Sequence, residues 1–458
     1  MPDIMNFNKS DKGPTIIDRL IRSPGVLIGV AILLGILGAA LLWLVWIFLG
    51  DPVRAFLGSQ FGMSLLVIAV SIALMFVVVA TSTLFERKIA AFIQDRKGPN
   101  RVGFWGVLQP MADGLKFLLK EEYTSGVTDK PLFVLAPCIA FITAFLGFAI
   151  IPWGGEIHFP WMDADALVTT QVVTLDVGIL YLLAIGGFGV YGVVLAGWAS
   201  NCKYSFFGGF RAAAQMISYE VPLGLVLIVI LLTVGSLRPE IIVNQQAQSG
   251  VWYVFLHPLA FILMITCVLA EANRTPFDLV EAEQELVGGF HTEYSSMKFA
   301  MFFLGEYAHM ITGCALVTTL FCGGWHVWFL TDIDNVAWWS GMLKFAIFWV
   351  KIILFIVLFM VIRWTIPRFR FDQLMKLAWK GMIPICLGLV VAQAVLTACG
   401  VVLEPDASLG RKIAVVAIYW IANGAVLGLS MWIAASGAAP ITGRQDNLAE
   451  IEVRPRAT

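Results

Sequence analysis

Charged side chains are scarce in this chain. They make up 13% of its 458 residues, whereas 59% of the residues are hydrophobic. A soluble domain of this length carries more polar surface than that. The composition therefore excludes an ordinary soluble protein and predicts an all-α polytopic membrane protein. The net charge of −1 gives no indication of a nucleic-acid partner, and we expect none.

Metal-ligand motifs are also missing. The seven cysteines form no CxxC pair and lie mostly in or beside apolar runs, and the five histidines have no metal-ligand spacing. We therefore expect no metal or iron–sulfur site. Gly187, Gly189 and Gly192 match the dinucleotide-binding fingerprint formally, but they lie inside an apolar run, whereas that fingerprint needs a strand before it and a helix after it. They suit close helix packing instead.

Long apolar runs are what the chain has in abundance. A helix of about 20 residues crosses about 30 Å of hydrocarbon, and most of the runs reach that length. We predict about ten transmembrane helices, near residues 25–49, 62–84, 131–152, 173–199, 212–236, 252–272, 298–322, 343–363, 380–402 and 412–436. The first run is too long for the core of a signal peptide, so we interpret it as a retained anchor.

Lysine and arginine indicate the orientation. If the N-terminus is cytoplasmic, the cytoplasmic segments hold most of the 30 basic residues, which is the positive-inside pattern. Both termini are then predicted to be cytoplasmic. Residues 107–122 have apolar positions at helical spacing but are too short and too charged to cross. We predict an amphipathic helix on the cytoplasmic surface, either a plain anchor or a doorway for a lipid-soluble substrate.

The acidic segment 270–296 is predicted to be the centre of the chemistry. It carries six carboxylates and one basic residue, Arg274. Thr275 and Pro276 predict a helix start, and Asp278 completes a capping-box pattern. In that helix Asp278, Glu281 and Glu285 would share a face and Glu283 would point elsewhere. Carboxylates gathered beside a membrane can hold and pass protons, but a solvated loop explains the same composition.

Ionisable residues also occur deep in the apolar runs. Glu220 lies nine residues beyond Arg211, which is about 13 Å along a helix. Glu306 is similarly deep, and Lys351 in a later run supplies a basic counterpart. Such groups are costly in a membrane and usually face a partner or a wet cavity, so they are candidates for proton transfer. Buried ion pairs that only hold helices together remain the alternative.

Several motifs resemble, in order, the signature segments of the H subunit (subunit 1) of proton-pumping NADH:quinone oxidoreductase, respiratory complex I. They are ERKIAAFIQDRKGPNRVG, LQPMADGLK, RAAAQMISYE, EANRTPFDLVEAEQELVGGF with HTEYS, and IPRFRFDQLM. The resemblance covers roughly residues 62–402. It divides the chain into a core over 62–402, an N-terminal segment 1–61 with an extra helix, and a C-terminal helix and tail over 403–458.

The resemblance implies specific roles. The quinone chamber and its interface with neighbouring subunits would be lined by Arg87, Arg96, Asp113, Arg211, Arg274, Arg368 and Arg370. Proton movement would be coupled through Glu86, Glu220, Glu271, Asp278, Glu281, Glu283, Glu285, Glu293 and Glu306, and Lys351 joins this set from its depth alone. The FMN and iron–sulfur clusters would lie in partner subunits, so the chain would bind quinone as substrate but carry no cofactor and have no activity alone.

The implied partners are the membrane-arm and hydrophilic-arm subunits of the complex, quinone and lipid, in a bacterial inner membrane. Two other functions fit some of the features. The first is the homologous membrane subunit of an energy-converting hydrogenase, which uses no quinone. The second is a proton-coupled secondary transporter, for which intramembrane carboxylates are also expected. The sequence contains no inverted repeat that favours the transporter.

Overall fold

The computed structural model describes residues 59–158, 167–279, 287–328, 330–331, 335–403 and 408–436. Eight helical segments in these ranges are long and apolar enough to cross a membrane, so the all-α polytopic class is confirmed. They are α4 (Gln60–Ile93), α6 (Lys130–Leu146, extended to Ile150 by the 3-10 turn η2), α7 (Gly178–Ala199), α8 (Lys203–Val234), α13 (Ser296–Phe321), α14 (Trp338–Thr365), α15 (Phe371–Lys376) joined through the π-helical turn η4 (Leu377–Met382) to α16 (Ile383–Ala398), and α17 (Leu409–Ser436).

Two of the ten predicted spans are not among these eight segments. The run at 25–49 lies outside the described residues. The run at 252–272 is not one helix, because it divides into α10 (Tyr253–Leu256) and α11 (Pro258–Glu271). Pro258 has no backbone N–H to continue the hydrogen-bond ladder, so a new helix begins there. With 14 residues, α11 is about 21 Å long and shorter than a complete span.

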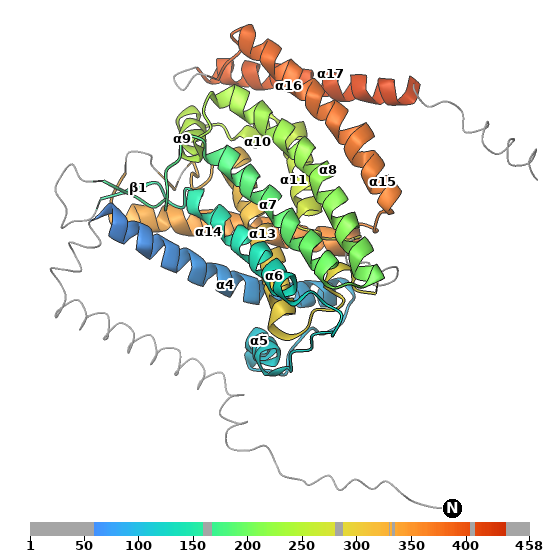
Figure 1. The fold of residues 1–458 in the computed structure, drawn as a ribbon. Coiled ribbons are helices and arrows are strands. Elements are labelled where there is room, and N and C mark those ends of the chain that lie inside the picture. The colour runs from blue at the N-terminus through green and yellow to red at the C-terminus, as the bar shows by residue number, and fades with distance from the viewer. Residues whose placement is uncertain are drawn as a thin grey trace, which may run out of the picture.

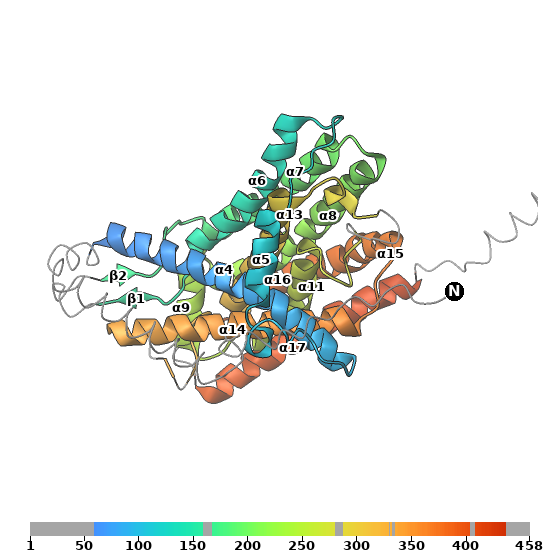
Figure 2. The same cartoon turned by 90° about the horizontal axis from the view of Figure 1, so that it is seen from below.

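Shorter elements connect the spans. The predicted amphipathic helix is confirmed as α5 (Gln109–Leu119), which follows a 3-10 turn, η1 (Phe104–Gly106). The sequence did not indicate α9 (Pro239–Ser249), the 3-10 turn η3 (Gly289–His291), or the antiparallel pair β1 (Glu156–Ile157) and β2 (Val168–Thr169). Figure 2 shows this pair and α9 at one end of the bundle and α15 at the other.

Helix α7 lies between α6 and α8 (Figure 1). Its glycines allow this close approach. A Cβ added at Gly192 would lie 2.8 Å from the backbone nitrogen of Ala140 in α6, and one at Gly197 would lie 2.7 Å from the carbonyl oxygen of Ser205 in α8. The glycine pattern of α7 therefore serves packing, at these two positions, inside a continuous helix.

Trp153, the first of the largest fully buried side chains, forms an aromatic stack with residues of α14. The indole of Trp153 is fully buried and stacks on Trp349 with ring centroids 5.2 Å apart, while Phe348 meets it edge-on at 5.5 Å. Helices α16 and α17 lie at the opposite edge of the bundle from α5 (Figure 1). Tyr419 fastens α17 by donating a hydrogen bond of 3.1 Å to the carbonyl of Val401.

The α6–α7 contact can be tested with Gly192→Ala. The added methyl group meets backbone atoms of α6, which cannot turn away, so we expect the free energy of unfolding to fall by about 1–3 kcal/mol, the usual cost of overpacking. The measurement is the thermal unfolding of the purified protein in detergent. Gly428→Ala in α17 is the matched control, because its Cβ would meet no atom within 4 Å. Equal stability of the two variants would contradict this account.

Candidate functional site

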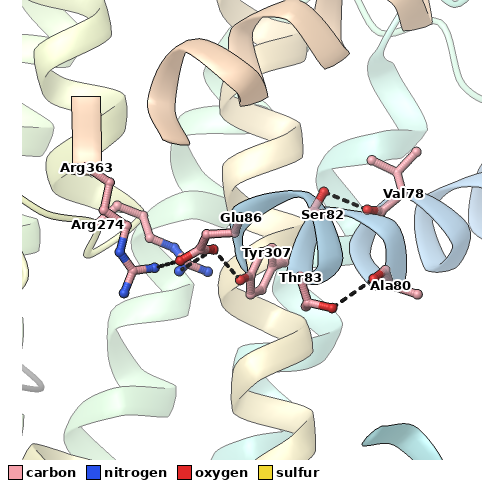
Figure 3. A network of polar contacts seen from close by, with 8 residues as sticks. All are labelled: Val78, Ala80, Ser82, Thr83, Glu86, Arg274, Tyr307 and Arg363. Carbon is pink, nitrogen blue, oxygen red and sulfur yellow. Dashed lines mark hydrogen bonds and ion pairs between the residues drawn. The ribbon is translucent and has the colours of Figure 1, made fainter. Parts of the chain in front are cut away.

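A half-buried carboxylate, Glu86, lies where α4, α13, α14 and the segment after α11 meet (Figure 3). The Tyr307 hydroxyl donates a hydrogen bond of 2.6 Å to its Oε2 atom. Arg363 forms an ion pair with Oε1, and Nη1 of Arg274 lies 3.6 Å from Oε2. The Arg274 guanidinium also lies 4.1 Å from the centre of the Tyr307 ring. Two guanidinium groups around one carboxylate leave the cluster with a net positive charge.

Helix α4 is longer than the sequence indicated. The predicted span ended at residue 84, but α4 continues to Ile93, so Glu86 and Arg87 are helical and point from one rigid element. Arg87 forms an ion pair of 2.8 Å with Asp113 of α5. This pair fixes the amphipathic helix against the bundle, close to the Glu86 cluster.

Two pockets adjoin Arg87. The first, here called the basic pocket, has a volume of about 880 Å³ and is lined by Glu86, Ala90, Gln109, Trp364 and the turn 96–101 together with Arg87. The second, here called the apolar pocket, has a volume of about 580 Å³ and lies between α4, α5 and α13. Its walls include Phe76, Val79, Phe117 and Phe303. Both volumes fall in the range of small-molecule sites.

The helix that the sequence predicted to begin at Thr275 is not formed over its first residues, 276–279. The described stretch 272–279 consists of turns and irregular backbone instead. The physical reason is tertiary contact: the buried Gln215 amide donates to the carbonyls of Ala270 (2.9 Å) and Phe277 (2.8 Å), and the Phe277 ring packs against Tyr219. These contacts hold the backbone in turns, whereas the capping pattern at Thr275 and Asp278 predicted a helix.

Asp278 is buried and binds Arg368, with Nη2 and Oδ2 2.9 Å apart. This ion pair joins the acidic segment to the basic segment that follows α14. The rest of the predicted acidic helix, with Glu281, Glu283 and Glu285, lies outside the described residues.

Glu220 and Glu271 line one small cavity inside the bundle, together with His309. The sequence singled out both carboxylates, but it indicated His309 only as a neighbour of Glu306. Its position at i+3 from Glu306 on α13 was the available signal. Glu306 itself does not line this cavity.

Lys351 does not line this cavity. Its ammonium group donates to the carbonyls of Cys322 (2.7 Å), Gly324 (2.8 Å) and His326 (2.7 Å) and lies 4.5 Å from the centre of the Trp252 ring. The three carbonyl groups accept the three hydrogen bonds that an ammonium group can donate. They lie just after the end of α13, where a positive charge is favoured. The contacts indicate a structural role at that helix end.

The remaining predicted residues are spread more widely. Arg96 donates to the Gln94 side chain at 2.7 Å and lines the basic pocket. Arg211 lies 5.8 Å from the Phe371 ring, and Arg370 is exposed immediately before α15. Glu293 lies in the turn between η3 and α13. Only Arg96 of these four shares a pocket with Glu86 in the described part of the chain.

Sequence reasoning missed Tyr307, Arg363 and Gln215 as parts of the site. Gln215 carried a usable signal, because a glutamine deep in an apolar helix needs hydrogen-bond partners. No local pattern pairs Tyr307 with Glu86, since the two are 221 residues apart in the chain.

These features define a polytopic helical membrane protein with a charged pocket at one end of its bundle, an apolar pocket beside it and carboxylates in its interior. The family model for NADH dehydrogenase matches residues 65–394. The chain belongs to this family, and the resemblance drawn from the motifs is confirmed.

Individual relatives agree with the family match. The chain is 51% identical over 316 residues to an H subunit of NADH-quinone oxidoreductase from Geobacter sulfurreducens, a match that covers 68% of this chain and 87% of the relative. It is 44% identical over 326 residues to the corresponding H subunit of Flavobacterium johnsoniae, covering 70% and 91%. For the H subunit of Frankia casuarinae the identity is 44% over 352 residues, covering 77% and 76%.

The hydrogen bond to Glu86 can be tested with Tyr307→Phe. A hydrogen bond to a charged group contributes about 1.5–3 kcal/mol, so we expect a loss of that size in the free energy of unfolding. The loss should shrink in a Glu86→Leu background, where the acceptor is gone. Thermal unfolding in detergent measures both. Tyr191→Phe, with a 62% exposed ring, is the matched control. An equal loss in both backgrounds would show that the contribution of Tyr307 to stability does not depend on Glu86.

Proposed function

We propose that this chain is the membrane subunit of proton-pumping NADH:quinone oxidoreductase that forms much of the quinone chamber and couples quinone reduction to proton translocation. The observation that carries the proposal is the pairing of the two pockets at Arg87. One is apolar and lies beside an amphipathic helix, and the other is lined by charged groups. An amphipathic molecule with an apolar tail and a polar head group fits such a pair.

The apolar pocket suits the isoprenoid tail of a quinone. Its walls come from the lipid-crossing helices α4 and α13 and from α5, so a molecule dissolved in the bilayer could reach it beside the amphipathic helix. The head group would then lie toward Arg87, Asp113 and the basic pocket. Quinone oxygens accept hydrogen bonds, and the guanidinium groups there are donors in every protonation state of the site.

Reduction of the quinone to quinol takes two electrons and two protons, and this creates a proton demand beside the Glu86 cluster. The charge balance between Glu86, Arg274 and Arg363 would change with it. We propose that altered protonation or hydration passes through the acidic segment, including Glu281, Glu283 and Glu285, to Glu271, Glu220 and Glu306, and from there to pumping subunits.

The same proposal assigns the partners and the place in the cell. The electrons would come from FMN and iron–sulfur clusters in hydrophilic-arm subunits, and the pumping would occur in membrane-arm subunits. Quinone and lipid would be the small-molecule partners, in a bacterial inner membrane with both termini cytoplasmic. Residues 62–402 would form the subunit core, and the segments 1–61 and 403–458 would be additions to it.

Purification of the native assembly tests the proposal as a whole. Companion subunits that carry FMN and iron–sulfur clusters, together with inhibitor-sensitive NADH:quinone reductase activity, are the expected result. A hydrogenase among the companions, or an assembly without any electron carrier, would overturn the proposal.

The apolar pocket can be narrowed with Gly114→Phe. Gly114 lines the pocket, and a Cβ there would meet no atom within 4 Å, so the side chain can be added without a backbone clash. We expect the KM for quinone to rise at least about fivefold with a smaller change in kcat, measured as NADH:quinone reductase activity of the assembled complex. Gly424→Phe in α17, which also has open space, is the matched control. An unchanged KM in the Gly114 variant would place the quinone elsewhere.

A further inference from the structure

Five helices leave a small cavity in the interior of the bundle. Its volume is about 50 Å³, and it is lined from α6, α7, α8, α11 and α13. Three of the lining side chains are ionisable, namely Glu220, Glu271 and His309. The other walls are mainly apolar, such as Leu223 and Leu316. A cavity needs about 10–15 Å³ to hold one water molecule, so water fits here.

The three ionisable groups lack protein hydrogen-bond partners within the described part of the chain. Among those residues, no hydrogen bond or ion pair to the carboxylates of Glu220 and Glu271 or to the imidazole of His309 is found. Buried polar groups in folded proteins are otherwise hydrogen-bonded, to protein or to ordered water. Because three ionisable groups border the cavity and it is large enough, water is a suitable ligand for these groups.

Three glycines of α7 leave room for the three ionisable side chains. A Cβ added at Gly187 would lie 2.9 Å from Oε1 of Glu220, and one at Gly186 would lie 3.0 Å from Oε1 of Glu271. A Cβ at Gly189 would lie 3.2 Å from Nε2 of His309. Three glycines therefore each face one of the three ionisable groups. In contrast to Gly192, they face the ends of side chains and not the backbone of another helix.

We propose that His309 is a third proton-holding group of this cavity, joined to Glu220 and Glu271 by bound water, and that Gly186, Gly187 and Gly189 keep the space in which the three groups are positioned. An imidazole ring has one nitrogen that accepts and one that donates, so it can take a proton on one side and release one on the other. The inference rests on the proposed function, in which Glu220 and Glu271 take part in proton transfer. It adds His309 and the glycines to that path.

The two parts of this inference need different variants. Gly187→Ala adds one methyl group against the movable end of Glu220, so the fold is retained while the carboxylate is displaced. Gly224→Ala is the matched control, because it lies four residues from Glu220 on α8 and its Cβ would meet no atom within 4 Å. His309→Gln keeps a polar side chain that can bind water but cannot carry a proton. His309→Asn is shorter than His309→Gln, so a loss of pumping in both variants cannot come from the length of one replacement side chain.

The assembled complex is reconstituted in vesicles, and proton pumping is measured beside NADH oxidation by a water-soluble electron acceptor. We expect Gly187→Ala, His309→Gln and His309→Asn to lower pumping at least about fivefold while oxidation by the soluble acceptor stays within about twofold. Gly224→Ala should leave both rates within about twofold of the unmodified protein. Pumping within about twofold of that control in Gly187→Ala and in both His309 variants would overturn the inference.

Infrared spectroscopy gives a second readout that needs no turnover. The band that Glu220→Gln removes should shift on transfer to D₂O within minutes and should have a different position in Gly187→Ala, but not in Gly224→Ala. A band that does not respond to D₂O would show a dry cavity and overturn the inference. An unmodified complex that reduces no quinone would instead overturn the proposed function, and the infrared result would still decide whether the cavity holds water.

Discussion

The rest of the structure depends on one constraint, which is that a charge inside an apolar bundle needs a compensating charge, a hydrogen bond or water. Glu86 meets it with Arg274, Arg363 and Tyr307, and these partners come from three other parts of the chain. The cluster therefore joins α4, α13, α14 and the segment after α11 at one point. Removal of one partner from such a cluster costs more than the pair itself contributes, because the remaining charge stays buried.

The same constraint separates the ionisable groups into two kinds. Lys351 and Asp278 are held by direct contacts with carbonyls or a guanidinium group, and their first role is to fix elements in place. Glu220, Glu271 and His309 instead border a cavity, where water can be gained or lost. A group that is fixed by protein partners has little freedom to exchange a proton, whereas a group that faces water can do so. Within the proposed function, the cavity is therefore the place in the described part of the chain where we expect proton transfer.

Sequence alone predicted the membrane class, eight of the described spans and the amphipathic helix. These features follow from hydrophobic length, charge spacing and motif order, all of which are local. Sequence patterns failed where contacts between distant segments decide the outcome. The capping pattern at Thr275 predicted a helix, but Gln215 and Tyr219 of α8 hold residues 272–279 in turns. Likewise, nothing near Gly187 in the sequence indicates that it faces Glu220.

The short stretch 271–274, directly before the predicted helix start at Thr275, connects the two sites. Glu271 at the end of α11 borders the cavity, and three residues later Arg274 binds Glu86. Gln215 ties both ends of this short stretch, at the carbonyls of Ala270 and Phe277, to the helix that carries Glu220. The Glu86 cluster and the cavity are therefore joined by a stretch of a few residues that hydrogen bonds hold against α8. Under the proposed function, a charge change at Glu86 that moved Arg274 would act three residues away from Glu271.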